Sequence, residues 1–183
     1  MTSRSRRLTA VPALTALTLT LALTGCSSVL DVLDDSPEAA QRDEPGGEIT
    51  ASADADVFSL QVGDCLNYVA LSETTTEFAS LPTVPCAEQH DAEIYAETTL
   101  TQDQHEADLA LAENPEAETP TYAEQYCYDA FAGFVGTPYE ESALDFSYLS
   151  PTAESWDQGD DVLQCIVVHL DGGLTGTMRD SAL

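Results

Sequence analysis

The densest group of polar residues near a cysteine is His90-Asp91 with Glu88 and Glu93 on either side. One imidazole and three carboxylates have the donor chemistry of a metal site. Protein zinc sites, however, usually combine several histidines or cysteines at short spacings, and the sequence has only three histidines, with no such pair here. Short polar side chains after a fixed point of the chain also bond backbone groups in turns. We therefore predict a structural turn between Cys86 and the next strand, and no metal site.

The other acidic and hydroxyl groups complete no catalytic or calcium-binding motif. After His105, Leu109 stands where a metalloprotease helix has its second histidine. The aspartates at 157, 160 and 161 lack the glycine and the terminal glutamate of a calcium loop. No serine lies in a Gly-x-Ser-x-Gly element. Trp156 would either cover a groove for a glycan or peptide or pack at the end of a loop, and we expect packing. The sequence thus predicts no catalytic residue, no metal and no cofactor.

Four of the five cysteines lie in the part of the chain that carries the aromatic residues, at positions 65, 86, 127 and 165. An even number of cysteines in an exported chain predicts two disulfides. None is spaced as Cys-x-x-Cys, so a zinc ribbon or a thioredoxin-like redox pair is not indicated. Three connectivities are open, of which we favour Cys65 with Cys86 and Cys127 with Cys165. Each bond would stabilise the fold by about 3 to 4 kcal/mol on the chain-entropy model.

The charge of the chain excludes several classes of protein. Its 183 residues include 33 acidic and 5 basic ones, for a formal net charge of -28, and no lysine. Without lysine there is no Schiff base and no phosphate-loop amine. A surface this negative repels phosphate backbones, so we expect no nucleic-acid partner. Hydrophobic residues still make up 43%, which is enough for a packed core.

The N-terminal residues have the pattern of an export signal. Three arginines lie within the first seven residues, and an uncharged apolar stretch follows from Leu8 to Leu23. The stretch ends in Leu23-Thr24-Gly25-Cys26, which resembles the lipobox of bacterial lipoproteins. This resemblance implies removal of residues 1–25, attachment of acyl chains such as palmitate at Cys26, and a lipid-anchored location on the extracytoplasmic face of the cell membrane. The alternative is an ordinary secretory signal with an incidental cysteine.

The aromatic residues mark where the folded domain is expected. All 13 lie between Phe58 and Trp156. From Cys26 to Asp56 the chain is rich in Ser, Ala, Asp, Glu, Pro and Gly, a composition that buries too little apolar area to fold. We therefore predict an acidic disordered linker over residues 26–56, a domain over 57–178 and a tail over 179–183.

Periodicity within the domain predicts an α+β fold, with a small, mostly antiparallel sheet and one packed helix. The best helix runs from Tyr122 to Phe134, because Thr121 and Glu124 form a capping box and Gly136 provides a stop. A marginal helix is expected over 103–113. Strands are expected over 57–62, 65–69, 83–86, 92–100 with one exposed face, 144–148, and 162–170 buried on both faces.

Several short segments resemble, in order and spacing, the septum formation-related domain family. They are Val62-Gly63-Asp64-Cys65-Leu66, Val84-Pro85-Cys86 with His90-Asp91-Ala92-Glu93-Ile94-Tyr95, Cys127 with Phe134-Val135-Gly136, and Pro151-Thr152 to Gly159-Asp160 before Cys165. Asp161 departs from the family pattern, which has a basic residue after Gly-Asp. The resemblance covers about residues 57–170 and implies an extracytoplasmic domain associated with cell-division septa, without an established enzymatic activity.

These observations predict a non-enzymatic, lipid-anchored envelope protein. Its domain would bind or scaffold division proteins, other envelope proteins or cell-wall material at the outer surface of the cell membrane. The alternative is a wall-modifying hydrolase that uses acidic residues, which would need two carboxylates about 5 to 9 Å apart. Two facing carboxylates in a pocket would favour the enzyme.

Overall fold

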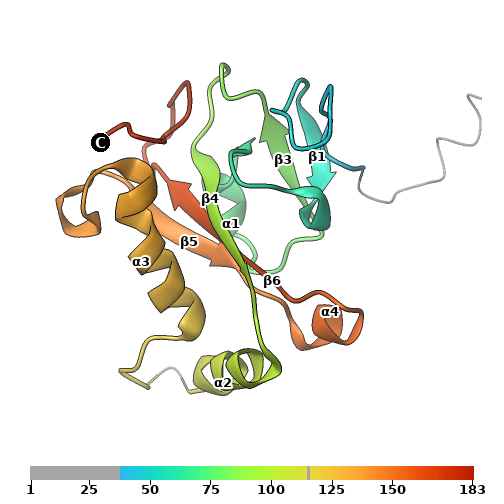
Figure 1. The fold of residues 1–183 in the computed structure, drawn as a ribbon, viewed down its shortest axis with the longest axis vertical. Coiled ribbons are helices and arrows are strands. Elements are labelled where there is room, and N and C mark those ends of the chain that lie inside the picture. Colours follow the sequence, from blue (N-terminus) through green and yellow to red (C-terminus); the bar gives the residue numbers. More distant parts are fainter. Residues whose placement is uncertain (1–37, 115) are drawn as a thin grey trace, which may run out of the picture. The chain divides into compact units, whose positions relative to one another are not determined.

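The computed structural model describes residues 38–114 and 116–183, which form a six-stranded antiparallel sheet with helices (Figure 1). The predicted signal peptide, the predicted lipid attachment at Cys26 and the predicted linker up to residue 37 lie outside the described residues. The strand order is β1-β3-β2-β4-β6-β5, and all five strand pairings are antiparallel. The α+β fold class predicted from the sequence is therefore confirmed.

The described part of the chain contains six strands, four helices and two 3-10 turns. The strands are β1 (Ala53–Asp56), β2 (Cys65–Leu66), β3 (Ser80–Val84), β4 (Ala92–Thr99), β5 (Asp145–Leu149) and β6 (Val162–Val168). The helices are α1 (Val69–Ser72), α2 (Gln102–Ala112), α3 (Tyr122–Val135) and α4 (Ala153–Asp157), with 3-10 turns η1 (Val57–Ser59) and η2 (Tyr139–Glu141). None of these helices is long and apolar enough to cross a membrane.

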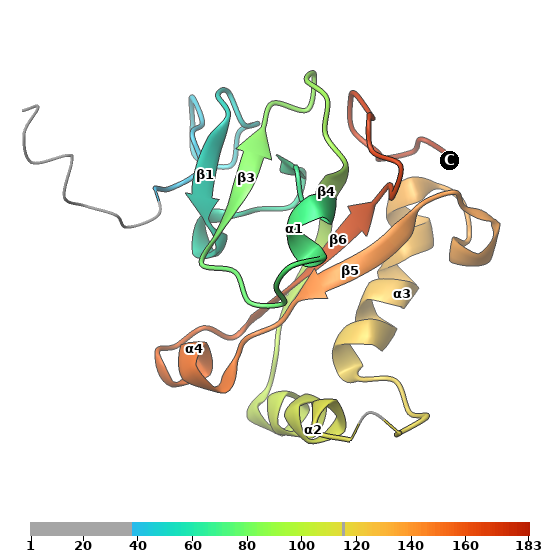
Figure 2. The same ribbon diagram turned by 180° about the vertical axis from the view of Figure 1, so that it is seen from behind.

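Helix α3 begins and ends where its local signals predict. Thr121 accepts the N–H of Glu124, and the Glu124 side chain accepts the N–H of Thr121, which completes the capping box. Gly136 ends the helix in the left-handed region, with φ of 88°, which a glycine adopts without steric cost. The helix buries Cys127 and Phe131 in a cluster with Cys165 and Val167 of β6. Figure 2 shows α3 beside β5 and β6, from the opposite side to Figure 1.

Strand β6 separates two hydrophobic clusters because its side chains alternate between the two faces of the sheet. Cys165 and Val167 face α3, whereas Ile166 and Val168 lie in the cluster with Leu66. The strand is buried on both faces after Val162, as predicted. The neighbouring strand β4 was expected to have an exposed face, and this is wrong at its start. Its first four residues are all buried, and the carboxylate of Glu93 is satisfied inside the protein.

Both disulfides have the connectivity favoured from the sequence. Cys65 is bonded to Cys86, with Cα atoms 5.2 Å apart, and Cys127 is bonded to Cys165, with Cα atoms 5.4 Å apart. The first bond joins β2 to the turn after β3. The second joins α3 to the central strand β6 and so fixes the helix on the sheet.

The folded part begins earlier than predicted, so the linker boundary at Asp56 is wrong. Residues Ala53–Asp56 form β1, which pairs with β3, and Arg42 reaches Asp64 in a buried ion pair. A single guanidinium and edge-strand pairing hold this segment, although its composition is that of a linker. The predicted strand over 57–62 is also wrong: η1 forms there because the Asp56 carboxylate accepts the N–H of Phe58.

The residues assigned to a C-terminal tail are part of the fold. Met178 is buried, and the Arg179 guanidinium lies 4.4 Å from the centre of the Phe134 ring. The N–H of Asp180 donates to the Phe134 carbonyl at the end of α3. The segment therefore covers the C-terminal end of α3.

Candidate functional site

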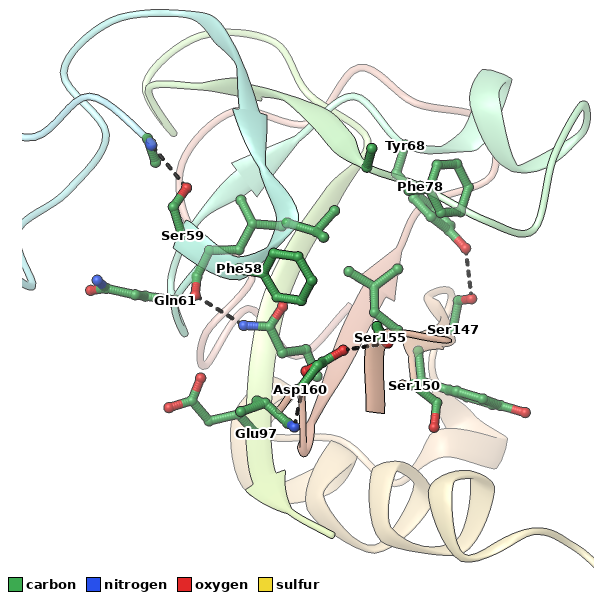
Figure 3. A pocket seen from close by; sticks show the side chains of 18 of the residues that line it. Phe58, Ser59, Gln61, Tyr68, Phe78, Glu97, Ser147, Ser150, Ser155 and Asp160 are labelled. Carbon is green, nitrogen blue, oxygen red and sulfur yellow. Dashed lines mark hydrogen bonds between the residues drawn. The ribbon is translucent and has the colours of Figure 1, made fainter. Parts of the chain in front are cut away.

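A long open groove of about 1670 Å³ lies on the face of the sheet away from α3. One wall is formed by residues 39–45 and by η1 with the residues that follow it. The other wall is formed by β5 and α4, and the chain between α1 and β3 closes one end. The floor includes Val162, Gln164 and Val168 of β6. Figure 3 shows side chains that line the groove. Pockets for small ligands usually measure about 300 to 1,000 Å³, so this groove has room for a larger occupant.

Two side-chain hydrogen bonds hold the walls of the groove to its floor and to each other. The Gln164 amide on β6 donates to the Leu60 carbonyl after η1, at 2.9 Å. The hydroxyls of Tyr68 and Ser147 lie 2.9 Å apart and join the chain before α1 to β5 (Figure 3). The Tyr68 ring also packs on Phe78, with centroids 5.6 Å apart. The groove is therefore held open by specific contacts between segments that are distant in sequence.

Phe58 is the most exposed aromatic side chain of the groove. It is 67% exposed and lies on η1, among the labelled residues of Figure 3. Leu170 is equally exposed at the far side of the groove. A ring left in water on a turn that is fixed by Asp56 and Ser59 is available for contact with a partner.

The charged residues of the groove are almost all acidic. The carboxylates that line it are those of Asp43, Glu44, Glu77, Glu97, Asp145, Glu154 and Asp160, against one cation, Arg42. That cation is neutralised within the wall: its two terminal nitrogens bind the two carboxylate oxygens of buried Asp64, with Nη1 to Oδ1 at 2.6 Å. Arg42 also donates to the carbonyls of Gly47 and Ser59. The free charge of the groove is therefore negative.

Two of these carboxylates have structural partners. Asp160 accepts the Ser155 hydroxyl at 2.9 Å and the Val162 N–H at 3.3 Å, which fixes the loop after α4. Asp145 accepts the Tyr139 hydroxyl at 2.7 Å, and this hydrogen bond is the main cause that raises the pKa of Tyr139. By contrast, Glu77, Glu97 and Glu154 are exposed. Their side chains are free to meet a ligand.

The His90 region lies outside this groove and has structural contacts. His90 is buried, its Nδ1 lies 2.9 Å from the Glu88 carbonyl, and its backbone bridges to Leu174. Asp91 accepts the backbone N–H groups of Tyr68 and Val69 at the start of α1. The predicted bonding of these side chains to backbone groups is confirmed.

Glu93 holds the C-terminal segment in place. Its two carboxylate oxygens accept the Thr177 hydroxyl at 2.7 Å and the Met178 N–H at 2.6 Å. Burial raises the pKa of Glu93 above its ordinary value of 4.5, although these two hydrogen bonds and the nearby His90 and Arg179 lower it. A carboxyl with a raised pKa is often catalytic, but this one does not line the groove.

The second histidine and the tryptophan also pack within the fold. The rings of His105 and Trp156 are stacked, with centroids 4.2 Å apart. Asp108 accepts the N–H groups of Tyr122 and Ala123 and so caps α3 from the neighbouring helix. Residues 38–114 and 116–183 contain no group of three or more His, Cys, Asp or Glu side chains arranged to hold a metal.

The sequence singled out the turn near His90 and Trp156, and it missed the groove. The alternation of Phe58, Leu60 and Val62 predicts that these side chains lie on one side of a strand. The signal against that strand was Asp56, which stands two residues before Phe58 and favours a turn. The carboxylates of the groove gave no signal, because they come from seven positions between 43 and 160 that only the curl of the sheet brings together.

Comparison with known proteins gives one match. The family model described as septum formation matches residues 48–180, which is most of the chain. No curated protein and no solved structure matches. The match includes the four bonded cysteines, the His90 region and β5 to β6, and it begins before β1, in agreement with the early start of the fold.

Proposed function

Because the chain belongs to the septum formation family, we propose that it is a lipid-anchored binding protein that acts in septum formation at the extracytoplasmic face of the cell membrane. It has no enzymatic step of its own in this proposal. The groove on the open face of the sheet binds a partner of the division machinery or of the envelope. The main support for binding is that Phe58 is exposed in a groove whose shape is fixed by hydrogen bonds between segments distant in sequence.

The lipid anchor is proposed from the order of features at the N-terminus. Basic residues, an apolar stretch and Leu23-Thr24-Gly25-Cys26 follow one another as in exported lipoproteins. Two or more acyl chains on Cys26 hold a protein stably at a bilayer, whereas one chain alone is marginal. A body with this excess of acidic groups stands away from anionic headgroups, so the lipid supplies the attachment.

Binding is favoured over hydrolysis by the size of the groove and by the structural partners of three acidic groups. Asp145 and Asp160 are occupied by structural hydrogen bonds, and the buried carboxyl with the raised pKa, Glu93, supports the C-terminal segment. The groove exceeds a small-substrate pocket in size. An aromatic ring in an open groove is the usual anchor of a binding surface.

The test is site-specific photo-crosslinking in intact cells. Lysine-directed crosslinkers are unsuitable because the chain has no lysine. A photoreactive phenylalanine analogue would replace Phe58 in the groove or, as a matched control, Tyr128 on α3, which is 40% exposed and outside the groove. We expect a crosslinked partner at position 58 and none at 128. Equal products at both positions, or none at 58, would contradict binding in the groove.

The anchor is tested separately by Cys26→Ala. We expect the variant to lose incorporation of labelled fatty acid and to leave the membrane fraction. Retention of label and of membrane binding would contradict the lipid anchor while leaving the groove proposal intact.

A further inference from the structure

The two edges of the sheet differ, and the uncovered edge lies in the groove. At β1, the carbonyl of Glu38 accepts the N–H of Asp56 at 2.7 Å, so a neighbouring segment covers part of that edge. At the other end of the sheet, β5 pairs with β6 alone among the described strands, and all five of its residues line the groove. The N–H of Phe146 donates to the carboxylate of its neighbour Asp145 at 2.8 Å. An unpaired strand edge accepts an extended segment by backbone hydrogen bonds.

The charge of the groove specifies the sign of that segment. Seven carboxylates line the groove, and the charge of Arg42 is matched by Asp64. Lysine or arginine side chains on an extended segment would complement this lining. Phe58 adds an exposed ring, whose face attracts a cation, next to the acidic wall.

Once residues 1–25, which carry three arginines, are removed as proposed, the chain itself cannot supply such a segment. Residues 27–37, which precede the described part, contain three aspartates and no basic residue. A second copy would bring the same acidic groove and no lysine. Like charges at close range disfavour both of these occupants, so the segment must come from a different protein.

We propose that the groove binds an extended, basic segment of a partner protein, which adds to the sheet along the free edge of β5. This inference rests on the proposed function, because it takes the groove as the binding site and names the chemistry of what fills it. Alternate side chains of the segment point towards the acidic lining and Phe58, since side chains of a strand alternate between its two faces.

The test uses the full chain in a non-ionic detergent and a labelled peptide of alternating Lys and Thr. Binding is followed by fluorescence anisotropy at low and high salt, with a Glu-Thr peptide as the probe of opposite charge. We expect saturable binding of the Lys-Thr peptide alone, weakened by salt. The triple variant Glu77→Gln/Glu97→Gln/Glu154→Gln should lower its affinity about tenfold, because it removes three exposed charges from the groove.

The matched control variant carries Glu113→Gln, Glu116→Gln and Glu118→Gln, which remove the same charge outside the groove. It should change the affinity less than about twofold, since these charges are further from the peptide. Equal weakening by both triple variants would overturn the proposal, because the attraction would then be nonspecific. The absence of saturable binding would overturn it as well.

Pairing with β5 is read from hydrogen exchange of the protein. The bound peptide should slow exchange of the amides of Asp145–Leu149 relative to those of α2. Binding without this protection would overturn the β5 part of the inference. A crosslinked partner at Phe58 in cells, together with no binding of the Lys-Thr peptide, would overturn this inference and leave the proposed function standing. A crosslinked product of twice the chain mass would identify a second copy and overturn it too.

Discussion

The two faces of the sheet are built from the same strands, but one is covered by a helix and the other carries an open groove. On one face, α3 covers Tyr95, Cys165 and Val167, and the Cys127–Cys165 disulfide holds the helix in place. On the other face, an open groove remains, and hydrogen bonds such as that between Tyr68 and Ser147 link the segments that line it. Each face carries a hydrophobic cluster, but only on the closed face does a disulfide fix a helix over that cluster. The open face is thereby free to expose Phe58 and a strand edge.

Removing the disulfide of the closed face should have the largest effect on stability and tests whether the two faces are independent. Cys127→Ala/Cys165→Ala should lower the free energy of unfolding by about 4 kcal/mol, because the bond closes a separation of 38 residues. Urea unfolding measures this loss. Where the variant remains folded, it should still crosslink through position 58. Unchanged stability, or selective loss of the crosslink, would mean that the two faces are not divided in this way.

A second variant addresses the wall of the groove. Arg42→Gln leaves the buried carboxylate of Asp64 without its cation and should cost about 3 kcal/mol. A double-mutant cycle with Asp64→Asn gives the coupling energy, and the double variant should cost less than the sum of the two single ones. Strictly additive effects in urea unfolding would show that the pair does not hold residues 38–50 on the domain.

The C-terminal segment offers a pH test of the closed face. Burial raises the pKa of Glu93 in the folded protein above 4.5, so folding favours its protonated form. The stability that this proton contributes is complete below pH 4.5 and is lost as the pH rises through the raised pKa. Relative to Glu93→Gln, the wild type should therefore become less stable over that rise. A constant stability difference between the two proteins, measured by urea unfolding across this range, would contradict the raised pKa.

The variant with the smallest expected effect on stability tests the exposed aromatic ring of the open face. Phe58→Ala should change the free energy of unfolding by less than about 0.5 kcal/mol, because the ring is 67% exposed. It should nevertheless reduce partner capture, scored by a photoreactive residue at Gln61, which also lines the groove. A large loss of stability, or unaltered capture, would mean that the ring belongs to the core and not to a binding surface.

What could be predicted from the sequence was local. The Thr121–Glu124 box and Gly136 specify both ends of α3, and the apolar run after Val162 specifies a strand buried on both faces. The odd-numbered residues Cys165 and Val167 of this strand pack in one hydrophobic cluster, and the even-numbered Ile166 and Val168 pack in the other. Of the three open cysteine connectivities, the favoured one, with two loops of moderate length, is confirmed.

The predictions from sequence were wrong where a contact between distant residues, and not the local composition, determines the structure. Residues 38–56 have the composition of a linker, but Arg42 finds Asp64, 22 positions further along, and β1 pairs with β3. Glu93 was predicted to lie on an exposed face. The residues that bind its carboxylate, Thr177 and Met178, are more than 80 positions away, so no local pattern indicates them. The groove depends on the curl of the whole sheet, for which a single sequence has no periodic signal.

The ion pair of Arg42 also determines how a protease meets this chain. Trypsin cleaves after lysine and arginine, and between residues 38 and 183 the sequence offers it only Arg42 and Arg179. Arg179 is exposed, whereas the Arg42 side chain is 8% exposed and bound to Asp64. Cutting after Arg42 therefore requires the wall of the groove to open first, and its rate, set against cutting after Arg179, measures how often that happens.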